Sequence, residues 1–190
     1  MTRSLLELKP SLRLDLGNGA FLKSLAEADV TAAYVDGLND PEVHRYMEAP
    51  RKQRQTLETV RAYVRDNAAD SRAILFGIFS EHVLRGTARL HDIDGDRGTA
   101  TVGIALFDRR VWGQGLGSAA IAAVARFAAA ELRLTRLEAG IIDANKGSIR
   151  AFEKAGFRRM RDKAADTDLG RTGLWILDSS GKAPQDSRNR

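Results

Sequence analysis

The sequence predicts an α/β protein of the α+β kind, in which a mostly antiparallel sheet is flanked by helices. Three observations support this prediction. The centre of the chain contains strand-like runs joined by tight turns, the flanking segments have helical periodicity, and closely spaced glycines separate the last central strand from a long alanine-rich helix. The 190 residues fit one domain with a full-sized core.

The N-terminal third is predicted to form a hairpin followed by helices. The alternating segments 11–16 and 21–25 flank Gly17-Asn18-Gly19, which is typical of a hairpin turn. Three helices are expected next, the later two with a proline or a capping residue at their start: residues 28–38, a short helix from Pro41 that ends before Pro50, and a longer helix capped by Thr56.

The central part of the chain changes to a period of two, which indicates strands. Runs at 74–79, 83–90 and 99–107 are joined by short polar turns, and this order predicts an antiparallel meander. Gly86 and Gly103 lie inside two of these runs, where glycine is typical of a β-bulge.

Helices and strands alternate after the glycine-rich turn. Asn145 stands where a helix N-cap belongs, and Gly156 stands where the left-handed residue after the same helix belongs. The predicted elements are a helix at 118–132, a strand at 137–142, a helix at 146–155, and strands at 157–161 and 174–177. Residues 1–178 are assigned to a single domain, and residues 179–190 to a disordered polar tail.

Composition excludes several classes of protein. The chain has no cysteine, which rules out disulfides, thiolate metal sites and a cysteine nucleophile, and its three histidines are too dispersed for a metal site. It has no apolar segment of membrane-spanning length and no signal-peptide core, so we expect a cytoplasmic protein with no membrane partner. The net charge of +5 comes from basic residues spread among acids, which disfavours nucleic acid as a partner.

Two basic clusters stand out in this distribution. They are Arg51, Lys52 and Arg54, and then Arg158, Arg159, Arg161 and Lys163. The ordinary interpretation of such a run is a solvated face. The alternative is that one cluster meets the phosphates of a cofactor or an acidic acceptor.

The glycine-rich turn is the segment most typical of ligand binding. In Trp112-Gly113-Gln114-Gly115-Leu116-Gly117, the glycines allow close approach and positive φ, and free N–H groups at the start of the following helix favour an anion such as a pyrophosphate. A simple tight turn is the alternative interpretation. A dinucleotide fold is disfavoured, because the preceding strand closes an antiparallel meander and the nearest strand acid is Glu138.

Two motifs, the glycine-rich turn and a second one about one strand later, make the chain resemble the GNAT superfamily of N-acetyltransferases, from about Phe21 to Leu177. The first is the glycine loop, which starts in that family with Gln or Arg and starts here with Trp112. With residues 38–43 upstream, this tryptophan is similar to the branch of ribosomal-protein N-terminal, spermidine and amino-sugar acetyltransferases. The second motif comprises Asn145, Ser148, Phe152, Glu153, Lys154, Gly156 and Phe157.

The resemblance implies a centrally splayed sheet and acetyl-CoA as the donor, with no metal. The pyrophosphate would lie on the N–H groups of residues 113–117, namely Gly113, Gln114, Gly115, Leu116 and Gly117, and the Ser118 hydroxyl would add to this cradle. The pantetheine arm is an amide chain, so it would pair like a strand with backbone groups around Ala105 and Phe107. Asn145 would contact the arm, and Trp112 and Phe152 complete the expected cofactor-binding set.

The implied reaction is direct attack of a neutral amine on the thioester, with the oxyanion held by a backbone N–H near Phe107. Glu138 is the first candidate for the general base, and Asp143 and Glu42 are alternatives. Many family members have tyrosine where Phe152 stands, so Ser148, one helical turn earlier, is the candidate general acid, although serine also favours helix starts.

The acceptor is expected to be a small-molecule amine or a protein N-terminus. Tyr46 is the candidate acceptor-binding residue, with Arg45 or His44 available to an acidic group, while Met47 is expected to pack in the structure. Arg159-Met160 departs from the branch, which usually has Glu-Gly there. A non-catalytic acyl-CoA-binding or nucleic-acid-binding module is the alternative function, and the choice between a monomer and a homodimer stays open.

Overall fold

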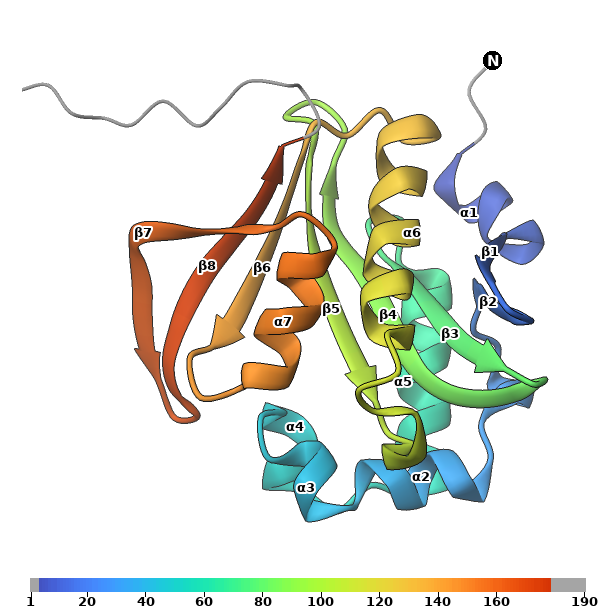
Figure 1. The fold of residues 1–190 in the computed structure, drawn as a ribbon. Helices are drawn as coiled ribbons and strands as arrows, with labels where there is room; N and C mark the ends of the chain where they lie inside the picture. The colour runs from blue at the N-terminus through green and yellow to red at the C-terminus, as the bar shows by residue number, and fades with distance from the viewer. Residues whose placement is uncertain (1–3, 179–190) are drawn as a thin grey trace, which may run out of the picture.

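A computed structural model describes residues 4–178 of the chain, apart from the side chains of residues 161–163. In that part, the strands form one sheet in the order β1-β2-β3-β4-β5-β6-β8-β7 (Figure 1). The strands are β1 (Arg13–Gly17), β2 (Ala20–Ser24), β3 (Ile74–Ser80), β4 (Val83–Asp94), β5 (Thr99–Leu106), β6 (Arg136–Ile142), β7 (Arg158–Thr167) and β8 (Gly170–Asp178).

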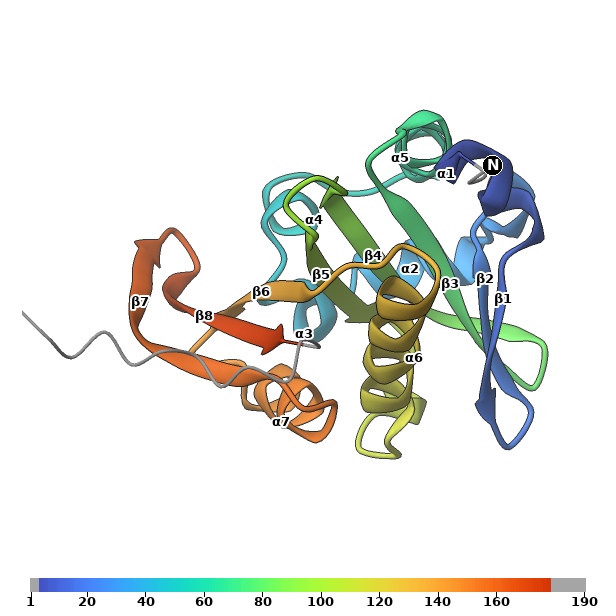
Figure 2. The same ribbon diagram turned by 90° about the horizontal axis from the view of Figure 1, so that it is seen from above.

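Helices cover both faces of the sheet. The helices are α1 (Leu5–Leu8), α2 (Ala32–Leu38), α3 (Pro41–His44), α4 (Glu48–Lys52), α5 (Leu57–Ala69), α6 (Leu116–Ala130) and α7 (Lys146–Lys154), with 3₁₀ turns at Lys9–Ser11, Glu27–Asp29 and Arg109–Val111. Figure 2 shows α6 and α7 on one face, and α2 and α5 on the other. Among residues 4–178, no helix is both long and apolar enough to cross a bilayer.

The period of two in β3 builds both hydrophobic cores. Ile74, Phe76 and Ile78 face the core that contains α6, while Leu75 and Phe79 face the core that contains α2 and α5. Because successive strand residues point to opposite faces, one buried strand serves two layers. This arrangement fixes the register of the central meander, since a slip by one residue would exchange the two sets.

The sheet opens between β5 and β6. These two strands are the parallel neighbours of the described sheet, and they pair only from Thr99–Thr101 to Arg136–Glu138. Beyond these residues β5 stays paired with β4 as far as Leu106, and β6 stays paired with β8 as far as Ile142. The two strands therefore diverge like a V, as Figure 1 shows, and the predicted mostly antiparallel, splayed sheet is confirmed.

Several local predictions are confirmed by their hydrogen bonds and dihedral angles. The hydroxyl of Thr56 caps α5 by accepting from the N–H of Thr59 at 3.2 Å. Asn145 caps α7 by accepting from the N–H of Ser148 at 3.1 Å. Gly156 has φ +94° directly after α7, as expected of a left-handed terminating residue.

Other local predictions are wrong. Pro50 does not follow a helix end but lies in the first turn of α4, where its missing N–H costs no intrahelical hydrogen bond. Gly103 is not at a bulge, because it pairs regularly with Arg89. A register shift does occur beside Gly86, whose own role is close approach: a Cβ there would lie 2.5 Å from the carbonyl oxygen of Ala105. The predicted disordered tail at 179–190 lies outside the described residues.

Candidate functional site

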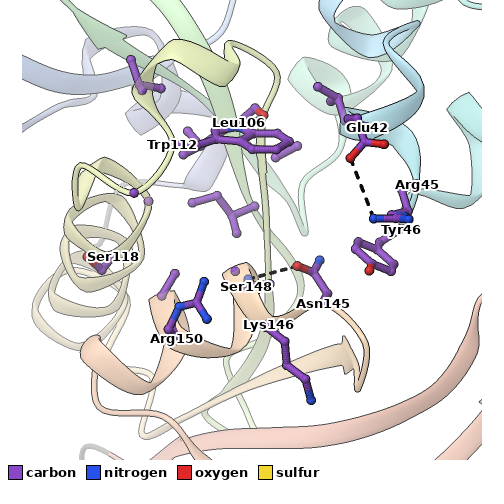
Figure 3. Close-up of a pocket in the computed structure, with 18 of the residues that line it drawn as sticks. Glu42, Arg45, Tyr46, Leu106, Trp112, Ser118, Asn145, Lys146, Ser148 and Arg150 are labelled. Atoms are coloured by element: carbon purple, nitrogen blue, oxygen red, sulfur yellow. Dashed lines mark hydrogen bonds and ion pairs between the residues drawn. The ribbon is translucent and has the colours of Figure 1, made fainter.

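A pocket of about 520 Å³ occupies the open end of the V between β5 and β6 (Figure 3). Four segments line it: the α3–α4 region, the end of β5, the glycine-rich turn with the start of α6, and the loop from β6 into α7. These segments are far apart in the sequence and meet only because the sheet diverges here. Among residues 4–178, no group of three or more His, Asp or Glu side chains is placed to hold a metal ion.

The glycine-rich turn presents its backbone to this pocket. Gly113 and Gly115 have φ values of +75° and +86°, and a Cβ on Gly113 would meet no atom within 4 Å. Gly115 is the N-cap of α6 and supplies no side-chain cap. The first N–H groups of α6 therefore lack an intrahelical acceptor and lie at the positive end of the helix dipole. This is the arrangement that binds phosphate at helix N-termini.

Side chains hold the turn in shape without filling it. The hydroxyl of Ser118 donates to the carbonyl of Gly115 at 2.8 Å, and the side-chain amide of Gln114 donates to the carbonyl of Arg110 at 2.7 Å. Gly117 is buried, and a Cβ there would lie 3.5 Å from Ile104 and Leu106. The loop glycines thus combine an open surface at Gly113 with close packing of α6 on β5.

Between Ala105 and Phe107, it is Leu106 that has its backbone groups on the free edge of β5, whereas the N–H of Phe107 faces β4. The N–H of Phe107 donates to the carbonyl of Arg85 at 3.2 Å, and its side chain stacks on Tyr34 with ring centroids 4.4 Å apart. Since strand residues alternate the direction of their backbone groups, Leu106 directs its N–H and C=O toward the open side. Ala105 lines the pocket but has its paired partner, Thr87, on the β4 side.

Asn145 and Ser148 stand together at the start of α7. The side chain of Asn145 caps the helix, so the hydroxyl of Ser148 is not needed for capping. Both residues line the pocket. In the part of the chain that the structure describes, no hydrogen-bond partner is recorded for the Ser148 hydroxyl. Ser148 therefore lines the pocket with a hydroxyl that is not used to cap α7.

Phe152 does not contact the pocket, which corrects its expected place among cofactor-binding residues. It is 2% exposed and packs edge-on against Phe157, with ring centroids 5.0 Å apart. Its position on α7 turns it into the core, where a phenyl ring is favoured over a group with a hydroxyl. Phe152 therefore supplies no hydroxyl to the pocket where many members of the resembling family have a tyrosine.

The three candidate bases have different surroundings. Glu138 lies at the closed end of the V, where it pairs with Thr101 and forms a 2.8 Å ion pair with Arg136, so it is not at the pocket. Asp143 is held at 2.7 Å by Arg159. Glu42 lines the pocket, with a loose 3.8 Å contact to Arg45. Of these three carboxylates, only Glu42 lines the pocket, because β6 carries Glu138 at the closed end of the V.

A hydrogen bond links the segment between α3 and α4 to the loop from β6 into α7. The hydroxyl of Tyr46 donates to the carbonyl of Ala144 at 3.2 Å, across a sequence separation of 98 residues. Arg45 lies over the Tyr46 ring at 5.7 Å, and Met47 also lines the pocket. His44 does not line it. Figure 3 shows Glu42, Arg45 and Tyr46 on one side of the pocket and Ser118 on the other.

The charge of the pocket wall is predominantly positive. Its basic residues are Arg45, Lys146, Arg150 and Lys154, against the single acidic residue Glu42. The sequence analysis assigned no site role to Arg150 or to Lys154, which it named only as part of the second motif. Their spacing of four residues places both on one face of a helix and could have indicated a shared site. It missed Leu106 and Ile104 because the edge they occupy depends on long-range pairing.

The described side chains of the two basic clusters do not line the pocket, and several of them contact neighbouring segments of the protein. Arg51 donates to the carbonyl of Asp168 at 3.3 Å, and Lys52 contacts the side chains of Glu48 and Asp168. Arg159 binds Asp143, as described above. These contacts tie α4 and β7 to neighbouring segments, and they pair the charges of Lys52 and Arg159 with carboxylates.

Asp108 anchors the segment that leads into the glycine-rich turn. It accepts from the side chains of Arg110 at 2.8 Å and Arg85 at 2.6 Å. Hydrogen bonds from Arg110 are the largest influence, and with the Arg85 bond they outweigh burial and hold the pKa of this carboxyl well below its usual range. The segment between β5 and the glycine-rich turn is therefore held to β4 through Arg85, in addition to its covalent link to β5.

The comparisons with known sequences agree with this geometry. The family model described as "Acetyltransferase (GNAT) domain" matches residues 20–158. The "Uncharacterized N-acetyltransferase p20" of Bacillus licheniformis is 30% identical over 148 residues, which cover 74% of this chain and 81% of that protein. The "Probable N-acetyltransferase YjcK" of Bacillus subtilis is 39% identical over 103 residues, covering 53% of this chain. The matched part spans 55% of that relative's length.

A solved structure with the same fold is the ribosomal L7/L12 α-N-protein acetyltransferase RimL in complex with coenzyme A. It has a TM-score of 0.78 and 16% sequence identity, covering 88% of this chain and 98% of that chain. The chain belongs to the GNAT acetyltransferase family. By class it is an acetyl-CoA-dependent N-acetyltransferase.

Proposed function

We propose that the protein transfers the acetyl group of acetyl-CoA to a primary amine that is carried by a neutral or anionic molecule, either a protein N-terminus or a small amine such as an amino-sugar nucleotide. The observation that supports this choice most is the charge of the pocket wall: with Arg150 and Lys154 assigned to the donor phosphates, Arg45 and Lys146 still outnumber the single acidic residue Glu42. A polyamine would be repelled by such a wall, because recognition of a polycation needs acidic side chains.

The donor half of the proposal is supported by the glycine-rich turn. Its open N–H groups suit the diphosphate of acetyl-CoA, and Arg150 and Lys154 add positive charge beside it. Asn145 and the free edge of β5 at Leu106 offer hydrogen-bonding groups to the amide arm. We expect Trp112, Gly113, Gly115, Gly117 and Ser118, which line the same pocket, to surround the phosphate end of the donor.

The chemical step needs one proton removed and one supplied. The amine nitrogen attacks the thioester carbon, the tetrahedral oxyanion is stabilised by an edge N–H of β5, and the C–S bond then breaks to release coenzyme A. Glu42 takes the proton from the amine, directly or through water, and the Ser148 hydroxyl donates to the departing sulfur. The thiol has a pKa near 8.5, so the acid contributes less than the base does for a lysine-like amine with a pKa near 10.4.

An assay of coenzyme A release with a panel of amines tests this proposal. The panel contains peptides with free N-termini, amino-sugar nucleotides, free amino sugars and spermidine. We expect peptides or amino-sugar nucleotides to be acetylated with kcat/KM at least about tenfold above that of spermidine. Preferred acetylation of spermidine would contradict the acceptor class. Failure of acetyl-CoA to raise the Tm would contradict donor binding itself.

A further inference from the structure

The carbonyl of Leu106, on the free edge of β5, is occupied by a side chain. The indole Nε1 of Trp112 donates to this carbonyl oxygen at 2.9 Å, although the residue is 41% exposed. Figure 3 shows the Trp112 indole beside Leu106 at the pocket. Water could donate to an exposed carbonyl equally well. The indole differs from water in that it holds its N–H at one fixed position on the edge of β5.

The indole is itself held in place from the side away from the pocket. The guanidinium of Arg109 lies 5.7 Å from its ring, and Arg109 in turn reaches the carboxylate of Asp40 at 3.3 Å. The side chain of Asp40 also caps α3. Trp112 therefore joins three parts of the site: the end of β5, the start of the glycine-rich turn and the helix that carries Glu42.

This hydrogen bond determines where an amide chain can pair with β5. A chain that runs along a strand edge uses N–H and C=O groups in alternation, and residues two apart present them on the same side. Because the indole already donates to the Leu106 carbonyl and its ring lies beside it, an arm that pairs from the phosphate end is directed to the Leu106 N–H first and then to Ile104. The register of the arm is thereby set, and with it the distance from the phosphates to the thioester.

We propose that Trp112 is a positioning residue whose indole N–H fixes the register of the pantetheine arm, so that the thioester carbonyl reaches its backbone N–H donor on β5. This inference rests on the proposed function, because it requires acetyl-CoA to lie along this edge. It differs from a role in binding alone, since a change of register moves the reactive carbonyl without removing the phosphate contacts.

Infrared difference spectroscopy of bound acetyl-CoA, labelled with ¹³C at the thioester carbonyl, tests the inference without requiring the acceptor. In the wild-type protein we expect the carbonyl band at lower wavenumber than in solution, because a backbone N–H donates to it. Trp112→Phe keeps a ring but removes the N–H donor. Its band should return toward the solution value, while the dissociation constant for acetyl-CoA, measured by calorimetry, changes less than about threefold and kcat falls roughly 10- to 100-fold.

Two further variants make the test specific. Glutamine carries its amide nitrogen at the same number of bonds from Cα as the indole nitrogen, so Trp112→Gln should restore much of the band shift. Trp175→Phe makes the same substitution at the other tryptophan, which is 4% exposed on β8 and outside the pocket wall, and should leave the band unchanged.

The outcomes separate this inference from the proposed function. A wild-type band in Trp112→Phe, or an unshifted band in the wild-type protein, would overturn the positioning role while leaving donor binding intact. If the wild-type protein does not bind acetyl-CoA in calorimetry, the proposed function fails and the inference fails with it.

Discussion

The two sides of the pocket are built by different means. The donor side is mostly backbone: N–H groups of the glycine-rich turn, the start of α6 and the edge of β5, which neighbouring residues in the sequence supply. The acceptor side is mostly side chains, such as Glu42 and Tyr46, on a short helical segment that meets the β6–α7 loop across a sequence separation of 98 residues. In the function that we propose, local geometry fixes donor recognition, while acceptor recognition depends on long-range packing.

The difference has a consequence for what substitutions can change. Backbone recognition is altered mainly by adding a side chain or a charge, because truncating a side chain leaves the N–H groups in place. Side-chain recognition is altered by simple truncation. Variants on the donor side should therefore act on acetyl-CoA binding, and variants on the acceptor side on turnover and on the choice of amine.

The largest effect is expected on the donor side, from a charge placed at Gly115. Asp and Asn have nearly the same shape and both tolerate positive φ, so Gly115→Asp and Gly115→Asn differ mainly in one negative charge. We expect Gly115→Asp to weaken acetyl-CoA binding roughly 100-fold relative to Gly115→Asn, because its carboxylate faces the diphosphate. Equal dissociation constants in calorimetry would show that the turn does not hold the phosphates.

On the acceptor side, Glu42→Gln should lower kcat without changing the dissociation constant for acetyl-CoA. Removal of a general base costs about 10²-fold for an amine that is protonated at neutral pH, and less for an α-amine. Rates at pH 7 and pH 9 with an α-amine acceptor check this, because an amine with a pKa near 7.8 is mostly neutral at pH 9 and the loss should shrink there. A larger loss in Glu138→Gln would contradict the assignment and return Glu138 to the reaction.

A smaller effect, about tenfold in kcat, is expected for Ser148→Ala. Its hydroxyl is free while Asn145 caps α7, so the Tm should change little. Asn145→Ala is the matched comparison, with an expected loss of about 1 kcal/mol in the free energy of unfolding. If Ser148→Ala lowers stability as much as Asn145→Ala does and leaves kcat unchanged, Ser148 has a structural role only.

The last effect is on stability and not on binding or turnover: it concerns the Asp108 carboxylate, which holds the segment before the glycine-rich turn, and it depends on pH. Because its arginine partners lower the pKa of Asp108 in the folded state, the carboxylate stabilises the protein fully above the unfolded pKa of about 3.9, and this stabilisation is lost as the pH falls below that value. Asp108→Asn should lower the free energy of unfolding by about 2 kcal/mol at pH 7. Urea titrations should show that the difference in the free energy of unfolding between the two proteins shrinks as the pH falls below about 4. A difference that does not change with pH would contradict this explanation.

The sequence was sufficient for elements whose signals are local. The glycine-rich turn, the Asn145 cap and Gly156 are each determined by residues a few positions apart, and the structure confirms their secondary-structure roles. The helix α1 was not predicted, although Ser4 and Glu7 form a capping box at its start, because a helix of one turn has little periodicity.

The functional roles were harder to predict because they depend on where the strands diverge. Glu138 stands on the expected strand, yet pairing with Thr101 puts it at the closed end of the V. Phe107 belongs to the expected run, but its N–H faces β4. Both placements depend on the direction and extent of strand pairing, which a single sequence does not contain.

The central claim is that open backbone amides at residues 113–117 bind the diphosphate of acetyl-CoA. Titration of ¹⁵N-labelled protein with coenzyme A, followed by amide chemical shifts, tests it most directly. We predict that the amides of Gly113, Gly115 and Gly117 shift downfield most strongly and saturate together, as N–H groups do when they donate to phosphate. Binding that leaves these signals in place while others shift would contradict the account.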